Sequence, residues 1–279
     1  MITLLQETRL ALAELGVRPH RHFGQHFLIN PTIVTRMMEA AGIRPHDTIL
    51  EIGPGLGVLS HELAARASRL YLVDVDVTLA ARLEKQFAKN ERVRVITADF
   101  LALDLDTTFP EPEIRVVASL PYNVASPILF RLLDHRDRFR TATVMIQKEV
   151  AERLTATPGT KAYGVPSVLT QLYGTVVTVC TIGPRSFFPP PKVESQVIHI
   201  EFQEHPRVPV TDEVAFRRLV KAAFAQRRKT LRNTLRAAGY ENLDEVSEKT
   251  GIDFQRRGET LTLEEFATLA NGYVGIESR

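Results

Sequence analysis

A glycine-rich turn constrains the fold of this 279-residue chain more than any other feature. The apolar run at residues 48–52 is followed at once by Gly53, Gly55 and Gly57, and a helical pattern of apolar residues then begins at Leu59. This order predicts a strand, a tight turn and a helix. Glycine at such a turn lets the backbone bend sharply and lets a ligand approach main-chain N–H groups without an intervening Cβ.

The spacing within this glycine turn (residues 53–57) favours one nucleotide-like ligand over another. Its sequence GPGLG has a glycine at every second position, with Pro54 between the first two. Dinucleotide enzymes have the different spacing GxGxxG. The turn therefore indicates S-adenosylmethionine as the ligand, and an ordinary strand-to-helix connection is the alternative for the turn considered alone.

Acidic residues end the next two apolar runs. The run at residues 70–73 ends at Asp74, about 20 residues past the glycine turn, where a carboxylate commonly holds a ribose diol. The run at residues 93–96 leads to Asp99 and Phe100, which suit the amino group and the ring of an adenine. Each acid alone is also explained as a helix cap or a loop residue. Three successive strand ends with fitting groups favour a cofactor site.

A second motif follows the expected strand at residues 114–118. An adenine N6 amino group is a poor nucleophile because its lone pair is delocalised into the ring. Ser119 Oγ and the carbonyl of Leu120 are acceptors for the amino hydrogens, Pro121 adds no competing donor, and Tyr122 offers a face for a flipped base. This base clamp (residues 119–122) predicts in-line methyl transfer to an adenine amine, accelerated by alignment. The alternative is a strand ending in a proline turn with a buried tyrosine.

Composition excludes several classes of protein. A hydrophobic content of 44% and a charged content of 24% are those of an ordinary globular protein. No apolar stretch approaches the roughly 20 residues of a membrane span, and the N-terminus lacks the apolar core of a signal peptide. Cys180 is the only cysteine, and the histidines have no ligand spacing. We therefore expect a cytoplasmic protein with no metal and no membrane association. We also expect a monomer, because no exposed apolar repeat suggests an interface between copies.

Basic residues are unevenly distributed along the chain. The segment at residues 216–236 has no acid, and its apolar periodicity predicts a helix that packs on a core and carries Arg228, Arg232 and Arg236 on one stripe. An acid-free stripe favours phosphate contacts, because solvated helix faces are usually mixed in sign. A second acid-free stretch at residues 18–36 contains Arg21 and three histidines. Together they indicate a structured RNA as the partner.

The order of apolar runs predicts the architecture. Strands that alternate with helices indicate a doubly wound parallel sheet. The expected strands lie near 48–52, 69–74, 93–97, 114–118 and 141–147, with two more at 176–182 and 196–202; helices are expected at 4–15 and 31–41, and a loop at 23–30. The aromatic, proline-rich loop at 187–192 is explained either by a ring pressed onto the target base or by a structural hairpin connection. A proline-containing linker at 204–210 divides the chain into domains 1–203 and 204–279, the second one helical.

Seven segments, in order along nearly the whole chain, resemble the rRNA adenine N6-dimethyltransferases. They are FGQHFL at 23–28, EIGPGLG at 51–57, ADFL at 98–101, SLPYN at 119–123, MIQKEVAERL at 145–154, FFPPPKV at 187–193 and RRKTLRNTL at 227–235. The last two, with RRGETLTLEEF at 256–266, make the chain most similar to the KsgA type. That type dimethylates two adjacent adenines in a hairpin of small-subunit (16S) rRNA.

The resemblance implies a fold, an activity and partners. The fold is an α/β, Rossmann-like class I S-adenosylmethionine methyltransferase sheet with a small C-terminal helical domain. The activity is dimethylation of adenine N6 groups with S-adenosyl-L-methionine as the cofactor. The partners are small-subunit rRNA and the immature small ribosomal subunit, so that the protein takes part in ribosome biogenesis in the cytoplasm.

The resemblance also implies roles for individual residues. His26 and Leu28 would touch the methionine end of the cofactor, Asp74 the ribose hydroxyls and Asp99 the adenine amino group. The full set of implied cofactor contacts is Gln25, His26, Leu28, Gly53, Gly55, Asp74, Val75, Asp99, Phe100 and Ser119. The implied contacts to the target base are Ser119, Leu120, Pro121, Tyr122 and a stacking Phe187. The expected RNA contacts are Arg21, Arg227, Arg228, Lys229, Arg232 and Arg236.

Two of these residues depart from the family's usual pattern. Asp74 stands where the family usually has Glu, and Ser119 where it usually has Asn. One weakened hydrogen bond costs about 1 kcal/mol, whereas a lost transition-state contact costs on the order of 100-fold in rate. Serine also opens the SPPY-type clamp of some DNA amino-methyltransferases. Besides the dimethyltransferase, two hypotheses therefore stay open: a ribosome-assembly factor with weak or no methyl transfer, and a large-subunit rRNA adenine dimethyltransferase.

Overall fold

The computed structural model describes residues 2–19 and 24–277, whose contacts form two compact units. The first unit comprises Met1–Ala151 and Val176–Phe202, and the second comprises Glu152–Thr175 and Gln203–Arg279. Residues 152–175 therefore belong to the second unit, although the sequence predicted that the second domain begins only at residue 204. The division into domains 1–203 and 204–279 stays a prediction, since contacts do not test which part folds alone.

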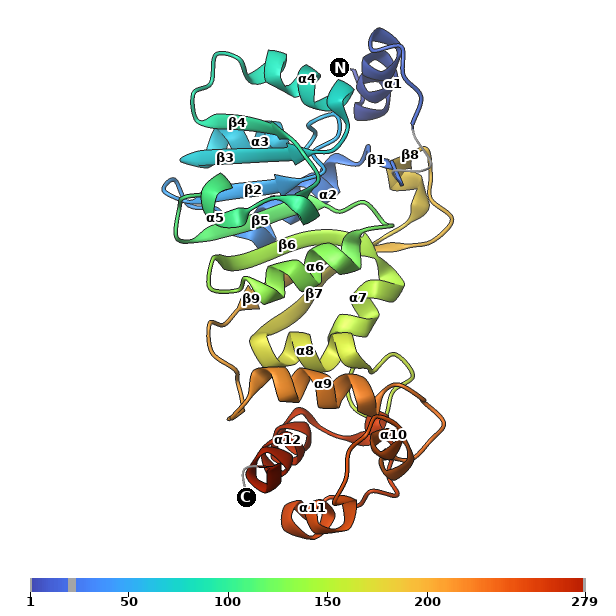
Figure 1. Cartoon of the computed structure of the whole chain (residues 1–279). Helices are drawn as coiled ribbons and strands as arrows, with labels where there is room; N and C mark the ends of the chain where they lie inside the picture. The colour runs from blue at the N-terminus through green and yellow to red at the C-terminus, as the bar shows by residue number, and fades with distance from the viewer. Residues whose placement is uncertain (1, 20–23, 278–279) are drawn as a thin grey trace. The chain divides into compact units, whose positions relative to one another are not determined.

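The first unit is built on a seven-stranded sheet in the order β4-β3-β2-β5-β6-β9-β7 (Figure 1). Within residues 24–277 its strands are β2 Thr48–Ile52, β3 Arg69–Asp74, β4 Val93–Thr97, β5 Ile114–Ser119, β6 Phe139–Gln147, β7 Gly174–Ile182 and β9 Ser195–Phe202. Each expected strand is confirmed to within a few residues. Strands β2 to β6 pair in parallel, but β9 pairs antiparallel with β6. The expectation of a wholly parallel sheet is therefore corrected to a mixed one.

Helices cover both faces of this sheet, as expected for an α/β fold: Figure 1 shows α3 behind it and α6 in front. The helices of this part of the chain are α1 Leu4–Glu14, α2 Pro31–Ala41, α3 Ser60–Arg66, α4 Val77–Phe87, α5 Leu105–Thr108, α6 Ala125–Asp134 and α7 Lys148–Thr155. The helix expected at 31–41 is confirmed, and its sequence explains its ends. Asn30 accepts a hydrogen bond from the Thr32 N–H at the start, and Gly42 ends the helix in the left-handed conformation.

A two-stranded ribbon joins the segment before α2 to the proline-rich loop. Strand β1 (Phe27–Leu28) pairs antiparallel with β8 (Phe187–Phe188). The segment at 23–30 was expected to be a loop throughout, and so was the segment at 187–192. Both are corrected, because Phe27 lies opposite Phe188 and Leu28 lies opposite Phe187. The flanks of the two segments are joined by a hydrogen bond from the Ile29 N–H to the Ser186 carbonyl (2.8 Å).

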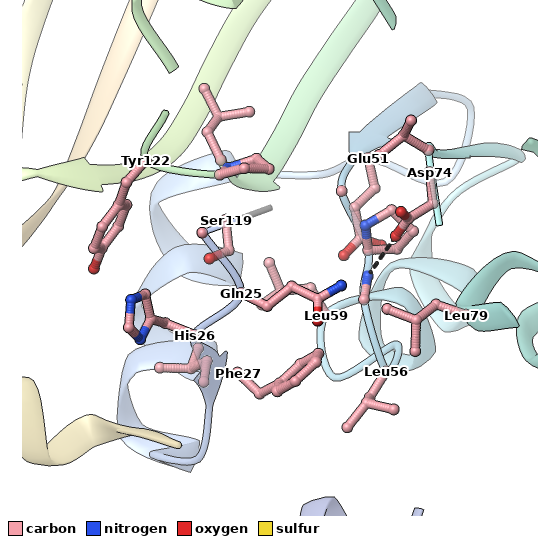
Figure 2. A pocket seen from close by; sticks show the side chains of 18 of the residues that line it. Gln25, His26, Phe27, Glu51, Leu56, Leu59, Asp74, Leu79, Ser119 and Tyr122 are labelled. Carbon is pink, nitrogen blue, oxygen red and sulfur yellow. Dashed lines mark hydrogen bonds between the residues drawn. The ribbon is translucent and has the colours of Figure 1, made fainter. Parts of the chain in front are cut away.

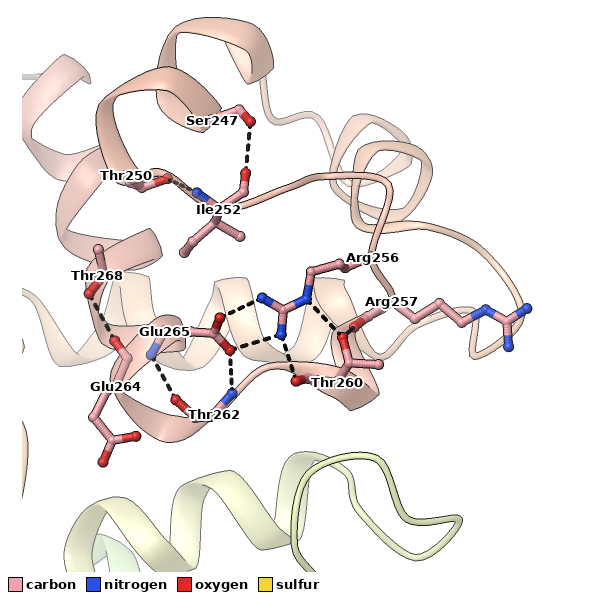
Figure 3. A network of polar contacts seen from close by, with 10 residues as sticks. All are labelled: Ser247, Thr250, Ile252, Arg256, Arg257, Thr260, Thr262, Glu264, Glu265 and Thr268. Atoms are coloured by element: carbon pink, nitrogen blue, oxygen red, sulfur yellow. Dashed lines mark hydrogen bonds and ion pairs between the residues drawn. The ribbon is translucent and has the colours of Figure 1, made fainter.

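The second unit is helical, as expected. Its helices are α8 Val165–Tyr173, α9 Glu213–Ala223, α10 Leu231–Ala237, α11 Leu243–Thr250 and α12 Leu263–Glu277. Figure 3 shows the polar network before α12, in which Arg256 pairs with Glu265. The Glu265 carboxylate also accepts from the Thr262 N–H (2.8 Å), and Thr262 Oγ1 accepts from the Glu265 N–H (3.2 Å). This capping box fixes the first turn of α12.

The single helix expected across residues 216–236 is wrong. Helix α9 ends at Ala223, a turn occupies residues 224–230, and α10 begins at Leu231. The N–H groups of Leu231 and Arg232 donate to the carbonyls of Arg256 and Phe254 (2.8 and 3.0 Å) instead of continuing the helix. The apolar positions of both helices are nevertheless buried, as expected. Arg228 lies in the turn, so the expected stripe of three arginines does not exist on one helix.

Candidate functional site

A cavity of about 300 Å³ lies in the first unit, where β2, β3 and β5 end (Figure 2). It joins the two motifs that the sequence singled out, the glycine turn and the base clamp. The residues named from sequence that line it are Gln25, His26, Leu28, Gly53, Gly55, Asp74, Val75, Asp99, Ser119, Leu120, Pro121 and Tyr122. Phe100 and Phe187 are not on its wall, and Arg21 lies outside the described residues.

The glycine turn requires glycine for two reasons. Gly53 and Gly55 have φ of +68° and +60°, in the left-handed region that side chains disfavour. A Cβ at Gly53 would lie 3.2 Å from Cδ of Pro121, and a Cβ at Gly55 would lie 3.2 Å from the ring of Phe27. The turn therefore packs directly against the base clamp and against β1.

Substituting Gly53 tests this packing. We expect Gly53→Ala to lower the free energy of unfolding by about 1–2 kcal/mol through backbone strain and to weaken cofactor binding further through the contact with Pro121. Gly239→Ala is the matched control, because Gly239 has φ +85° and nothing lies within 4 Å of the added Cβ. Urea unfolding and titration calorimetry measure both effects. Equal cofactor affinity in the two variants would contradict the role of the Pro121 contact.

Asp74 supports the glycine turn from the end of β3. Its side chain is buried, and its two oxygens accept hydrogen bonds from the N–H groups of Gly55 (3.1 Å) and Asp76 (2.9 Å). Burial raises the pKa of this carboxyl, whereas the backbone hydrogen bonds lower it. Both oxygens of the short Asp74 side chain are thus used by backbone N–H groups at the glycine turn and just after β3. Its contact with a ribose stays a prediction.

Glu51 is a cavity residue that the sequence analysis missed. It is 1% exposed, and Ser60 Oγ donates a 2.6 Å hydrogen bond to its carboxyl. Burial raises the pKa of Glu51 to about 8, which the bond from Ser60 opposes and the neighbouring Asp74 reinforces. The group is therefore largely neutral at pH 7. A lone acid within an apolar strand was the signal that could have identified it.

The raised pKa of Glu51 predicts a dependence of stability on pH. In the unfolded chain this carboxyl titrates near 4.5, so that between pH 4.5 and about 8 the folded protein binds more protons than the unfolded one. The free energy of unfolding therefore falls as pH rises through this window. We expect Glu51→Gln to flatten that decline. Urea unfolding at pH 5, 6, 7 and 8 measures it, and an unchanged slope in the variant would contradict the assignment.

The base clamp is held by neighbours on both sides of Tyr122. The Leu120 N–H donates to the Met145 carbonyl (3.0 Å), which anchors the end of β5 to β6. The hydroxyls of Tyr122 and Ser195 share a 2.5 Å hydrogen bond, and the centroid of the His26 ring lies 5.4 Å from that of Tyr122. Burial raises the pKa of the Tyr122 phenol. At neutral pH the clamp therefore presents an uncharged ring.

Asp99 and Phe100 lie where β4 gives way to a short helix. Asp99 lines the cavity, and its side chain also caps the helix Phe100–Ala102 by accepting from the Leu101 N–H (2.9 Å). Phe100 is buried under the guanidinium of Arg131, 5.7 Å from the ring centre. Asp99 is thus both a cap and a cavity residue. That Phe100 covers a cofactor ring stays a prediction, which its burial does not support.

The two aromatic residues of β8 lie apart from the cavity wall. Phe187 is 3% exposed within the cluster that contains Leu28 and Met37. Phe188 packs beside Phe27, and the guanidinium of Arg9 lies 5.2 Å from its ring centre. These contacts favour the second explanation of the loop at 187–192, a structural hairpin connection. Stacking of Phe187 on a base stays a prediction, and it needs the ring to leave this position.

Some basic residues of the second unit form ion pairs with acidic side chains from other segments. Arg232 pairs with Asp244, and Arg227 pairs with Glu259 at 3.4 Å. Both acids follow the basic segment in the sequence, so its composition alone could not reveal them. Arg228, Lys229 and Arg236 are exposed. Of the RNA contacts predicted in this unit, only these three form no ion pair within the described part of the chain.

Two kinds of site are absent from the described ranges 2–19 and 24–277. No group of three or more His, Cys, Asp or Glu residues there is arranged to hold a metal ion. No helix of those ranges combines the length and the apolar character needed to cross a membrane.

Sequence comparison identifies relatives along the whole chain. The family model described as ribosomal RNA adenine dimethylase matches residues 16–274. The chain is 45% identical over 268 residues to ribosomal RNA small subunit methyltransferase A of Geobacter metallireducens, covering 94% of this chain and 98% of that protein. It is 44% identical over 255 residues to the protein of the same name from Syntrophotalea carbinolica, covering 91% and 96%.

Solved structures agree with this relationship. A dimethyladenosine transferase from Plasmodium falciparum has a TM-score of 0.73 and 26% identity, with 88% of this chain and 96% of that one covered. The 23S rRNA methyltransferase ErmE has a TM-score of 0.68 and 25% identity, with 89% and 99% covered. The cavity with its glycine turn and base clamp, the fold and the full-length sequence match lead to one conclusion. The chain belongs to the ribosomal RNA adenine dimethylase family.

Proposed function

We propose that this protein transfers methyl groups from S-adenosylmethionine to the N6 amino groups of two adjacent adenines in small-subunit rRNA. One observation carries the proposal: a single cavity joins the glycine turn to the base clamp, so that a methyl donor and an adenine amine would meet inside it. The names of the relatives from Geobacter and Syntrophotalea, matched over 96% or more of their length, support the small subunit as the source of the RNA.

The cavity suits a cationic nucleoside ligand. Asp74 and Asp99 line it together with the largely neutral Glu51, and no lysine or arginine does so among the described residues. The glycine turn brings main-chain N–H groups close to the ligand, with no Cβ in the way. S-adenosylmethionine supplies an electrophilic methyl group on a sulfonium. We assign Asp74 to the ribose and Asp99 to the adenine of the cofactor, and His26 and Leu28 to its methionine end.

The base clamp prepares the amine for attack. Ser119 Oγ and the Leu120 carbonyl would accept the two amino hydrogens, which leaves the nitrogen lone pair free to point at the methyl group. Pro121 donates no hydrogen bond that would compete for that lone pair. Tyr122 offers its ring face to the flipped base. The acceleration comes from alignment and from acceptors that are already in place before reaction.

The exposed cations of the second unit support RNA as the substrate. We assign phosphate contacts to Arg227, Arg228, Lys229, Arg232 and Arg236, together with Arg21 of the first unit. Such contacts position an RNA without reading its sequence. The proposal further takes the immature small subunit as the partner and a cytoplasmic monomer as the working form.

Salt dependence distinguishes these cations from one another. We expect Arg228→Ala to weaken RNA binding and to reduce the slope of log K against log salt by about 1. Arg232→Ala should change that slope less, because Asp244 already neutralises Arg232. Arg94→Ala, an exposed arginine on β4, is the control. Binding to small-subunit rRNA at several salt concentrations measures the slopes, and equal slopes for all three variants would contradict the assignment.

The substrate is tested by offering a choice of RNA. Unmethylated small and large ribosomal subunits are incubated together with the protein and labelled S-adenosylmethionine, and the RNAs are then separated. The proposal predicts label in the small-subunit RNA. Label confined to the large-subunit RNA would favour the drug-resistance type of methylation, and binding without label would favour an assembly factor.

A further inference from the structure

The ring of Tyr122 is fixed by residues outside the base clamp. Its hydroxyl shares a 2.5 Å hydrogen bond with Ser195 Oγ at one end of the side chain. Its ring is contacted by the ring of His26, with 5.4 Å between centroids and 31° between planes (Figure 2). These two contacts restrict the Tyr122 side chain to few of the orientations that an exposed tyrosine adopts.

His26 is held in turn by the proline-rich connection between β8 and β9. Its Nδ1 lies 2.7 Å from the carbonyl oxygen of Pro189. Because a carbonyl oxygen only accepts, Nδ1 is the donor and carries the proton. The ring that contacts Tyr122 is therefore attached to the same connection that ends in Ser195. We call residues 189–195 the proline segment.

Ser195 itself has little freedom to move. It is 0% exposed, begins β9 and pairs with Gln147 of β6. The residue before it accepts a backbone bond from the Lys148 N–H (3.0 Å), and the side chains of Glu194 and Lys148 form an ion pair of 2.8 Å. The serine hydroxyl is thus a fixed point of the sheet against which Tyr122 is oriented.

We infer that the proline segment positions Tyr122 for the flipped adenine, with Ser195 as a positioning residue and the Pro189 carbonyl acting through His26. The inference rests on the function proposed above. The aromatic side chain of β8 assigned to the base, Phe187, is buried away from the cavity. What reaches Tyr122 from this part of the chain is the Ser195 hydroxyl directly and the Pro189 carbonyl through His26. Ser195 does not line the cavity, so it acts on the substrate only through Tyr122.

Mispositioning the stacked base should slow the chemical step and leave cofactor binding unchanged. Methyl transfer needs the amine aligned with the methyl group, and a displacement of about 1 Å can cost up to about 100-fold in rate. Removing one hydroxyl that orients the Tyr122 ring should reduce the rate less than such a displacement. We expect Ser195→Ala to lower the single-turnover rate about tenfold, which corresponds to the free energy of about one hydrogen bond, with an unchanged dissociation constant for S-adenosylmethionine.

The experiment is a double-mutant cycle on the two hydroxyls. Wild type, Ser195→Ala, Tyr122→Phe and the double variant are compared in single turnover on unmethylated small subunits at saturating cofactor. Because both single variants remove one shared hydrogen bond, the double variant should be no slower than either. Thr143→Val is the matched control: Thr143 is also 0% exposed, and its hydroxyl shares a 2.8 Å hydrogen bond with Nδ1 of His199 on β9. We expect the control to keep the wild-type rate.

Three results would overturn the inference while leaving the proposed function intact. They are losses that multiply in the double variant, a wild-type rate for Ser195→Ala, and an equal loss in Thr143→Val. Urea unfolding of the four proteins checks the contact without turnover, and additive changes in stability would also count against it. A wild-type protein that transfers no methyl group overturns the proposed function and the positioning role with it.

Discussion

Replacing Tyr122 by alanine is expected to lower the rate of methyl transfer about 100-fold. Stacking of a base on an aromatic ring contributes about 1–3 kcal/mol, and an unstacked adenine also loses its alignment with the methyl donor. Tyr122 lines the cavity, and burial raises the pKa of its phenol further above neutral pH, so that its ring stays uncharged. Single-turnover transfer to unmethylated small subunits measures the rate.

The matched variant keeps the ring and removes only its hydroxyl. Tyr122→Phe should retain stacking and lose only the hydrogen bond to Ser195, for a loss of about tenfold. The dissociation constant for S-adenosylmethionine should be unchanged in both variants. If Tyr122→Ala transferred methyl groups as fast as Tyr122→Phe, the ring would have no part in holding the base.

Replacing Asp74 by alanine is expected to have the largest effect on cofactor binding. The change leaves the partly buried N–H groups of Gly55 and Asp76 without their acceptor, which costs about 1–2 kcal/mol for each. The glycine turn loses its support, and the proposed contact with the ribose is lost with it. We expect the free energy of unfolding to fall by about 2–4 kcal/mol and cofactor affinity to fall by about tenfold or more.

Asp104 provides the control for this variant. Its side chain also accepts two backbone hydrogen bonds, from Asp106 and Thr107, but at the start of α5 and away from the cavity wall. Asp104→Ala should lose about 1 kcal/mol of stability and keep wild-type cofactor affinity. Titration calorimetry and urea unfolding separate the two effects. Wild-type affinity in Asp74→Ala would remove Asp74 from the cofactor site and leave it a purely structural role.

Most of the sheet could be predicted because local signals and burial agree there. The apolar run at residues 48–52, the glycine turn and the acids at strand ends follow from the period of the sequence and from the chemistry of tight turns. The direction of β9 did not follow as readily. Strand β9 lies between β6 and β7 and pairs antiparallel with β6, and no local sequence pattern indicates that placement.

Features that depend on contacts between distant segments could not be predicted. Helical periodicity runs through residues 216–236, yet carbonyls from residues 254–256 accept the N–H groups at the start of α10 and separate it from α9. The partner of Arg232 is Asp244, beyond the basic segment. Likewise, residues 119–122 were enough to identify the base clamp. Ser195, which holds Tyr122, follows 73 residues later, and a local sequence pattern carries no information about contacts over that separation.

The central claim, that one cavity brings a methyl donor to an adenine amine, is tested most directly by the product. Unmethylated small subunits are treated with labelled S-adenosylmethionine, and the RNA is digested and analysed by mass spectrometry, with Ser119→Asn assayed beside the wild type. We predict dimethyladenosine at two adjacent positions with the wild type, which would show that Ser119 serves in the clamp. Label recovered only with Ser119→Asn, and absent from the wild type, would contradict the claim and make the chain an assembly factor that binds the subunit without methylating it.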